Sequence, residues 1–309
     1  MKNILSLLPL LLMMATAVAT ADSKPPNIVL IISDDQSYTD YGFMDHSAIE
    51  TPHLDQLAQE SALFRRGYVP TALCRPALMT LVTGLYSHQN KTTGNNPANT
   101  PANTAYAKKT AKDIRELLIS HIDQTGALPQ WLAKKGYVSH QSGKWWEGSF
   151  GRGGFTGGMT QGFPKPGGRH GDAGLKIGRQ GMEPVFNFID RSVAAENPFF
   201  VWYAPFLPHT PHNPPKRLLE KYRKAGRAND VTKYYAMCEW FDETCGELLA
   251  HVEERGLTED TLVVFVVDNG WIQREETSGY APRSKRTPYE GGVRTPILLS
   301  WPGHIEPGE

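Results

Sequence analysis

The sequence lacks an excess of charge of either sign. Its 309 residues contain 32 Lys and Arg against 32 Asp and Glu, a formal net charge of zero, and no long run of like charge. Such a chain gives neither nucleic acid nor an anionic membrane surface an electrostatic reason to bind. We therefore expect no nucleic-acid partner and a globular protein whose function depends on a local site.

Cysteine is also scarce. Three cysteines in 309 residues exclude a disulfide-framework protein. Cys238 and Cys245 lie in a stretch, residues 234–254, whose apolar spacing predicts one helix. Two helical turns separate them by about 10 Å, which is beyond the reach of a disulfide. We interpret both as buried small apolar residues, which leaves Cys74 as the unusual cysteine.

The chain has no apolar run of roughly 20 residues, the length needed to span a bilayer. The apolar run at residues 4–14 follows Lys2 and precedes small residues at Ala15, Ala17, Ala19 and Ala21. This pattern is typical of a cleavable signal peptide, here residues 1–21. We therefore expect a secreted or periplasmic protein without a membrane anchor.

Apolar, β-rich runs alternate with helical patterns along the rest of the chain. The expected strands are residues 27–32, 137–142, 198–204 and 261–267; the expected helices are residues 51–61, 76–85, 126–135 and 234–254. This alternation predicts an α/β fold with a large, mainly parallel β-sheet sandwiched by helices. Two loop-like zones, residues 90–110 and the glycine-rich residues 148–181, are expected on the surface near a site.

Acidic side chains follow two of these strands directly. Asp34 and Asp35 come after the first strand, and Asp268 and Asn269 come after the last. Either pair alone would be explained by a turn or a helix cap. Because residues beyond the carboxyl ends of parallel strands converge at one edge, both pairs together favour a Ca²⁺ or Mg²⁺ site built from hard oxygen ligands.

Cationic and proton-donating side chains fall near the same edge. Lys144 and His209 each follow an expected strand, and Lys285 follows the Asp268 segment. Each residue alone would be an ordinary solvated or hydrogen-bonded side chain. Beside a cation, the three together predict a site for an oxygen-rich anion such as sulfate or phosphate.

Six segments carry a resemblance to a known family. They are NIVLIISDDQSYTDYG, LCRPALMTLVTGLYSHQ, SGKWW, APFLPHTPH, VVFVVDNG and KRTPYEGGVRTP. In order and approximate spacing the chain resembles the sulfatase family of the alkaline-phosphatase-like superfamily, from about Pro26 to the end. The resemblance implies that residues 22–309 form the N-terminal part of the catalytic fold, with the usual small C-terminal subdomain missing or truncated.

The resemblance also implies a mechanism. Cys74 opens a motif in which the cysteine is oxidised to formylglycine, one hydroxyl of whose hydrate attacks sulfur while the second later lets sulfate leave. The ligands of one Ca²⁺ per chain would be Asp34, Asp35, Asp268, Asn269 and modified Cys74. Lys144 and Lys285 would bind sulfate oxygens, and His209 would bind sulfate or protonate the leaving oxygen.

The implied partners are a sulfate-ester substrate, with sulfated polysaccharide included, and a formylglycine-generating or other sulfatase-maturating enzyme. Two departures from the family pattern stand out. Leu78 replaces the motif arginine, and Arg75 either substitutes for it or is a solvated surface residue. Trp146 replaces a family histidine and either stacks on a sugar or packs in the interior.

Three functions remain open. The first is sulfate-ester hydrolysis by an arylsulfatase-like enzyme. The second is a noncatalytic sulfoglycan-binding protein or truncated pseudosulfatase, which the two departures favour. The third is a phosphatase or phosphodiesterase of the same superfamily, against which a cysteine at the nucleophile position and a single oxygen-rich metal set both speak.

Overall fold

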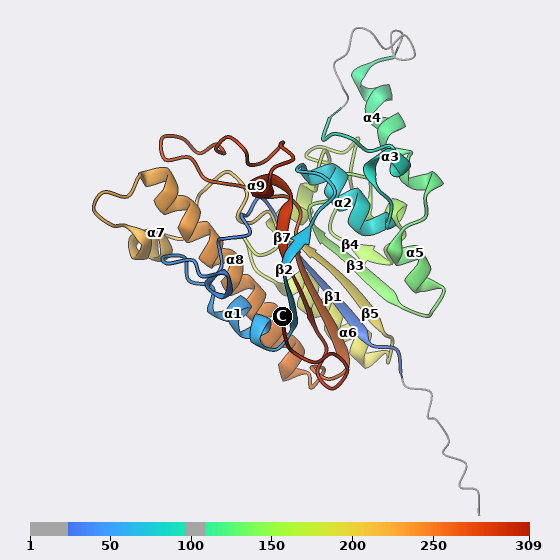
Figure 1. Ribbon diagram of the computed structural model, residues 1–309. Helices are drawn as coiled ribbons and strands as arrows, with labels where there is room; N and C mark the ends of the chain where they lie inside the picture. The colour runs from blue at the N-terminus through green and yellow to red at the C-terminus, as the bar shows by residue number, and fades with distance from the viewer. Residues whose placement is uncertain (1–23, 97–108) are drawn as a thin grey trace, which may run out of the picture.

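The computed structural model describes residues 24–96 and 109–309 (Figure 1). The expected signal peptide lies outside these ranges, as does most of the loop expected at residues 90–110. Within the two described ranges, no helix combines the length and the apolar character needed to cross a bilayer.

The centre of the fold is a seven-stranded sheet, formed within the described residues, with strand order β2-β7-β6-β1-β5-β3-β4. Strands β4, β3, β5, β1 and β6 run parallel, whereas β7 is antiparallel to both β6 and β2. The mainly parallel α/β fold is thereby confirmed. The strand bounds are β1 Asn27–Ser33, β2 Ala62–Tyr68, β3 Val138–Gly143, β4 Gly157–Gly158, β5 Phe199–Ala204, β6 Thr261–Val267 and β7 Arg294–Ser300.

Strands β1, β3, β5 and β6 coincide with the four expected strands to within a residue or two. Strands β1, β5 and β6 form because their apolar, β-branched and aromatic side chains are buried against helices. Strand β3 is mostly polar (VSHQSG) and is held by its pairing with β5. Strands β2 and β7 are additional. Arg65 and Arg66 interrupt the apolar pattern of β2, and Pro296 interrupts that of β7, so neither resembles a central parallel strand.

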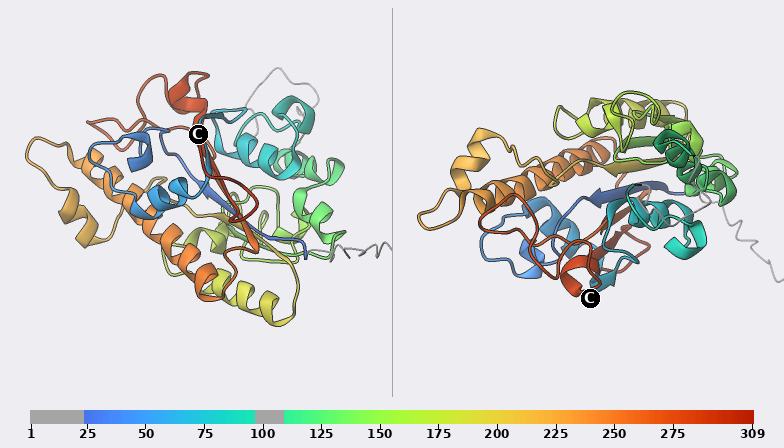
Figure 2. Two further views of the ribbon diagram at one scale, coloured as in Figure 1. Left: turned by 60° about the horizontal axis from the view of Figure 1, so that its bottom comes forward. Right: turned by 90° about the horizontal axis from the view of Figure 1, so that it is seen from above.

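Helices cover both faces of the sheet because alternate residues of a strand point to opposite sides. Val29 and Ile31 of β1 belong to one apolar core with side chains of α1 (Pro52–Gln59), α6 (Glu183–Ala194) and α8 (Asn229–Glu254). Leu30 and Ile32 belong to a second core with α2 (Cys74–Thr83) and α5 (Leu128–Ala133). Figures 1 and 2 show α8 on one side of the sheet and α2 and α5 on the other.

The expected helices correspond to α1, α2, α5 and α8. Cys238 and Cys245 lie buried on α8 as free thiols, which confirms their interpretation. The remaining helices are α3 Ser87–Asn90, α4 Ala111–Ile119, α7 Lys216–Tyr222 and α9 Glu290–Val293, with 3-10 turns at Gly42–Met44, Ile122–Gln124, Phe150–Gly153 and Asp172–Lys176.

The glycine-rich residues 148–181 form a long loop with only short regular segments. The loop folds back against the end of β3, where Gly143 has a φ of 83°. A Cβ at Gly143 would collide with the carbonyl group of Ala204. Glycine therefore lets β3 lie close to β5 and turn sharply into Lys144.

Candidate active site

The carboxyl edge of the sheet brings the acidic residues together. Strand β1 pairs with β6, so Asp34 and Asp35 emerge beside Asp268 and Asn269. The backbone N–H of Asp35 donates to Oδ1 of Asp268 at 3.2 Å, and Nδ2 of Asn269 donates to Oδ1 of Asp35 at 2.7 Å. All four side chains are buried. The edge that the sequence predicts is therefore a compact acidic cluster.

Cys74 is the first residue of α2, and its buried sulfur reaches this cluster. Sγ lies 4.0 Å from Oδ1 of Asp34 and 3.9 Å from Oδ1 of Asp35. Nζ of Lys285 lies 3.2 Å from the same sulfur. Potential ligand atoms of Asp34, Asp35, Cys74 and His209 all lie within 4.8 Å of one another. Four chain segments thus meet at the Cys74 side chain.

The cluster fits a hard divalent cation. Three buried oxygens of the cluster have no hydrogen-bond partner among the described residues, namely Asp34 Oδ2, Asp268 Oδ2 and Asn269 Oδ1. Burying such oxygens without a donor is costly, whereas Ca²⁺ and Mg²⁺ take carboxylate and amide oxygens as ligands. Burial and the neighbouring Asp34 carboxylate raise the pKa of Asp268 well above its ordinary value, which shows that negative charge is crowded here.

Two lysines hold permanent positive charge in the cluster. Lys144 Nζ lies 2.7 Å from Asp34 Oδ1, and Lys285 Nζ lies 2.6 Å from Asp35 Oδ2. Burial by itself would lower both lysine pKa values, but the carboxylates outweigh it and raise each pKa above its ordinary value. Both ammonium groups therefore stay charged at neutral pH.

Asp35 stays ionised within the cluster. Burial by itself raises the pKa of Asp35, but Lys285, His209 and Lys144 outweigh burial and hold that pKa well below its usual range. Its backbone has a φ of 62°, in the left-handed region that non-glycine residues rarely adopt. Such strain is common where a structure must aim a functional side chain.

His209 follows β5 and is oriented by its own loop. Nδ1 lies 2.6 Å from the carbonyl oxygen of Thr210 and donates to it, while Nε2 lies 3.2 Å from Oδ2 of Asp35. The ring stacks on Phe206 with centroids 4.3 Å apart. Burial and the positive charge of Lys144 lower the pKa of His209, although Asp34 and Asp35 oppose this. The proton that His209 can gain or lose is the one on Nε2.

Arg75 is buried, so its interpretation as a solvated surface residue is wrong. Its Nε and Nη2 each donate to a carboxylate oxygen of Glu147 at 2.7 Å, and Glu147 is equally buried. Among the described contacts, its guanidinium pairs with Glu147 and not with the acidic cluster. A direct role for Arg75 at the nucleophile stays a prediction. Leu78, one turn further along α2, packs in the second apolar core.

Trp146 is also buried, with 3% of its surface exposed, and belongs to the same apolar core. Its ring lies 5.2 Å from that of His170 and 4.9 Å from the guanidinium carbon of Arg169. His170 and Arg169 come from the glycine-rich loop and are not predicted by the sequence. No periodicity marks them, and a single histidine between glycines was the only available signal.

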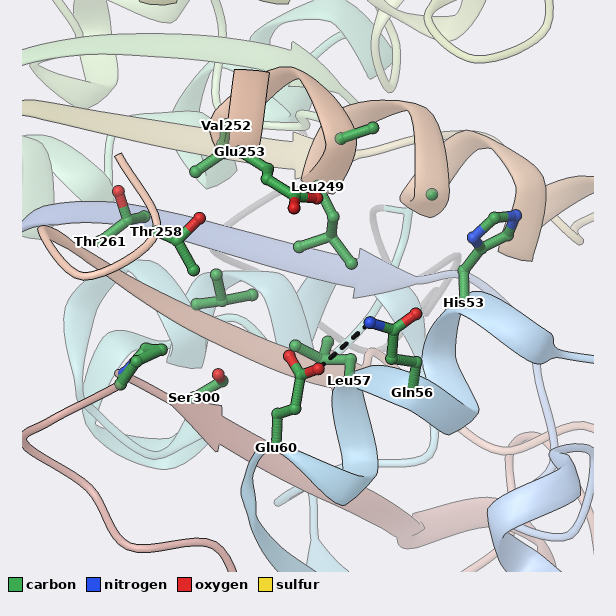
Figure 3. A pocket seen from close by; sticks show the side chains of 14 residues that line it. His53, Gln56, Leu57, Glu60, Leu249, Val252, Glu253, Thr258, Thr261 and Ser300 are labelled. Atoms are coloured by element: carbon green, nitrogen blue, oxygen red, sulfur yellow. Dashed lines mark hydrogen bonds between the residues drawn. The ribbon is translucent and has the colours of Figure 1, made fainter. Parts of the chain in front are cut away.

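A separate cavity of about 300 Å³ lies between α1, α8, β6 and β7. Figure 3 shows His53 and Gln56 of α1 facing Leu249 and Glu253 of α8 across it. Thr261, the first residue of β6, also lines this cavity, whereas Asp268 follows the last residue of the same strand. The cavity therefore lies at the other end of β6 from the acidic cluster.

The known proteins that this chain matches decide its family. The family model described as Sulfatase matches residues 26–309. The chain belongs to the sulfatase family. Human arylsulfatase A is 29% identical over 97% of this chain, and the dog N-acetylgalactosamine-6-sulfatase is also 29% identical over 97%. The chain spans 64% and 62% of the lengths of these two relatives.

Solved structures share the fold of this chain. The crystal structure of Ps i-CgsB superposes with a TM-score of 0.72 at 25% identity and covers 92% of this chain and 68% of that one. The same protein has been solved in complex with k-i-k-neocarrahexaose. The match to the family model confirms the family expected from the six segments.

Proposed function

We propose that this sulfatase-family protein hydrolyses sulfate esters through a nucleophile made from Cys74. The observation that supports this most directly is the position of Cys74. It begins a helix, it is buried, and its sulfur lies 3.2 Å from Lys285 and at most 4.0 Å from two carboxylates. A group attached to its Cβ would be held among permanent cations and metal-ligating oxygens, as attack on an anionic ester requires.

The residues that would hold a Ca²⁺ ion are Asp34, Asp35, Asp268, Asn269 and modified Cys74. Bound there, the ion would supply positive charge to the oxygens of a sulfate group. The three unpartnered oxygens of Asp34, Asp268 and Asn269 support this ligand set.

Oxidation of Cys74 to formylglycine would supply, once hydrated, one hydroxyl for attack on sulfur and a second whose deprotonation releases sulfate. Lys144 and Lys285 would bind the sulfate oxygens, since both remain charged. His209, once protonated, would donate its Nε2 proton to the leaving alcohol oxygen, because its Nδ1 proton is already committed to Thr210. Trp146 is buried in the apolar core, so it would contribute to the site by packing.

Sulfated carbohydrate is the substrate class that we propose. One relative is an N-acetylgalactosamine-6-sulfatase, and a similar solved structure is a complex with k-i-k-neocarrahexaose. We further propose export of the protein through the signal-peptide pattern of residues 1–21, and maturation of Cys74 by a sulfatase-maturating enzyme.

The test combines chemistry and activity. The full chain is purified from its native host, and the peptide containing Cys74 is analysed by mass spectrometry. Conversion to formylglycine should lower its mass by about 18 Da and create an aldehyde that a hydrazide traps. Sulfate release from an aryl sulfate and from sulfated oligosaccharides should be measurable and should disappear in Cys74→Ala. An unmodified thiol together with no sulfate release would overturn the proposal.

One observation favours a noncatalytic alternative. Leu78 packs in an apolar core at the position of the motif arginine, so no guanidinium at that position supports the nucleophile. A sulfoglycan-binding protein would retain affinity for sulfated oligosaccharide without releasing sulfate. A phosphatase would instead release phosphate from aryl phosphate faster than it releases sulfate from aryl sulfate, and the same assay separates it.

A further inference from the structure

Two arginines converge on a single neutral oxygen close to the candidate active site. Nη2 of Arg115, on α4, lies 2.9 Å from Oδ1 of Asn96, and Nε of Arg169, in the glycine-rich loop, lies 3.1 Å from the same oxygen. Nη1 of Arg115 also donates to the carbonyl oxygen of Asn95 at 3.4 Å. Two guanidinium groups that contact the same oxygen lie close enough for their like charges to repel. An anion bound beside them would relieve this repulsion.

Neither arginine pairs with a carboxylate in the described part of the chain. The nearby acids have other partners. Glu147 pairs with Arg75, whereas Glu116 and Asp123 both pair with Arg152. Residues 97–108, which the structure does not describe, contain no Asp or Glu. Burial lowers the pKa of Arg115, and the positive charges of Arg75 and Arg169 lower it further. Positive charge is therefore in local excess here.

The arginine pair is connected to the Cys74 site by direct contacts. The backbone N–H of Arg75, the residue after Cys74, donates to Oδ1 of Asn95 at 2.9 Å. The guanidinium of Arg169 lies over the ring of Trp146, two residues after Lys144. Arg169 is exposed, and Arg115 is half-buried. An anionic group attached to a substrate in the Cys74 site could reach them from solvent.

We infer that Arg115 and Arg169, held by the carboxamide of Asn96, form a second anion subsite. It would take a sulfate or carboxylate on a sugar next to the one whose sulfate ester is hydrolysed. Guanidinium groups suit this task because their planar forks bind both anions through paired hydrogen bonds. This inference rests on the proposed function and narrows its substrate class to glycans carrying at least two anionic groups.

The test measures binding and turnover separately. Binding is measured by calorimetry in a Cys74→Ala background, which cannot turn over substrate. Two tetrasaccharide probes are used, one of chondroitin 6-sulfate, which carries carboxylates and sulfates, and one of carrageenan with two sulfates. Arg115→Gln/Arg169→Gln should weaken binding of at least one probe about tenfold at low salt, and the loss should shrink as salt rises. Loss for carrageenan identifies a sulfate as the bound group, and loss for chondroitin alone identifies the carboxylate.

The matched control is Arg191→Gln. Arg191 is exposed on α6, close to the start of β5 and therefore at the opposite end of the sheet from the site. This variant should bind both probes like the parent protein. With Cys74 intact, kcat/KM for the monoanionic p-nitrophenyl sulfate should change less than twofold in the double variant.

Equal loss on p-nitrophenyl sulfate and on the tetrasaccharides would overturn the subsite, as would unchanged binding of both probes. A Kd above about 1 mM for both probes in the Cys74→Ala protein with both arginines intact would overturn it as well. The proposed function fails differently. If the double variant loses binding selectively but the protein with Cys74 intact releases no sulfate, the subsite is supported and the proposed hydrolase activity is contradicted.

Discussion

At the residue scale, the pairing of Arg75 with Glu147 joins the start of α2 to the loop after β3. Both side chains are almost completely buried, and two 2.7 Å hydrogen bonds connect them. Cys74 stands immediately before Arg75, and Lys144 stands three residues before Glu147. The pair therefore fixes the start of α2, with Cys74, relative to the loop that carries Lys144. In the mechanism that we propose, Arg75 would be a positioning residue.

Breaking this pair from one side should be costly. Glu147→Leu leaves the Arg75 charge buried without a partner and should lower the free energy of unfolding by about 3–5 kcal/mol in urea titrations. Arg75→Met/Glu147→Leu should recover much of that loss, because an apolar pair leaves no buried charge. Glu243→Leu, which breaks the exposed pair with Arg217, should cost about 1 kcal/mol or less. Additive losses in the double variant would contradict the buried-pair interpretation.

At the element scale, a carboxyl group of α8 caps α1. Oδ1 of Asp242 accepts the backbone N–H of Leu54 at 2.8 Å, and Oδ2 accepts that of His53 at 3.2 Å. Helix α1 has no side-chain cap of its own, so a helix distant in sequence satisfies its first N–H groups. This contact holds α1 and α8 together on one face of the sheet.

Burial raises the pKa of Asp242 to about 7, against the two N–H groups that oppose it. The Asp242 carboxyl is therefore more protonated in the folded than in the unfolded state between about pH 4 and pH 7, and its contribution to the free energy of unfolding should fall as pH rises through this window. The raised pKa of Asp40, also about 7, acts in the same direction, whereas the pKa values of His140, His170 and His212, each lowered to about 4, act in the opposite direction. Asp242→Asn removes one falling contribution, so the free energy of unfolding of this variant should rise more, or fall less, with pH than that of the parent protein.

This difference in slope is measured by urea unfolding of variant and parent at three pH values between about 5 and 7. The exposed Asp260 provides the control, and Asp260→Asn should keep the parent slope. An Asp242→Asn variant whose stability has the same pH dependence as that of the parent would show that Asp242 titrates normally in the folded protein.

At the scale of the whole molecule, the acidic cluster joins the ends of β1 and β6 to the start of α2 and the loop after β5. These segments are far apart in the chain, so the unfolded chain cannot present the cluster. A cation that binds only the folded protein stabilises it by mass action. Metal binding should therefore be measurable as an increase in the stability of the folded protein, independently of turnover.

Ca²⁺ at about 100 times its Kd should raise Tm by roughly 5 °C in a chain of this size, and a chelator should reverse the shift. Asp268→Ala should remove the shift, since Asp268 carries one of the unpartnered oxygens. Glu259→Ala, an exposed acid before β6, should respond to Ca²⁺ like the parent. Equal Tm shifts in the Asp268 and Glu259 variants would show that the ion binds elsewhere. A larger Tm shift with Mg²⁺ than with Ca²⁺ would show that the site prefers Mg²⁺.

Much of the fold could be predicted because buried segments have recognisably apolar sequences. Strands β1, β5 and β6 are continuous apolar runs, as strands buried on both faces must be. Strands β2 and β7 carry charged residues or proline and depend on their partners for their pairing. The convergence of Asp34, Asp35, Asp268 and Asn269 could be predicted because the ends of parallel strands share an edge.

The sequence by itself therefore determined the fold class, the family and the edge of the sheet where the site lies. Only the tertiary structure decided which side chains meet around that edge. It paired Arg75 with Glu147, buried Trp146, and brought Arg115 and Arg169 to one carboxamide oxygen. The physical reason is that strand ends are ordered by backbone hydrogen bonds, whereas these side chains find partners through long-range contacts that no local periodicity encodes.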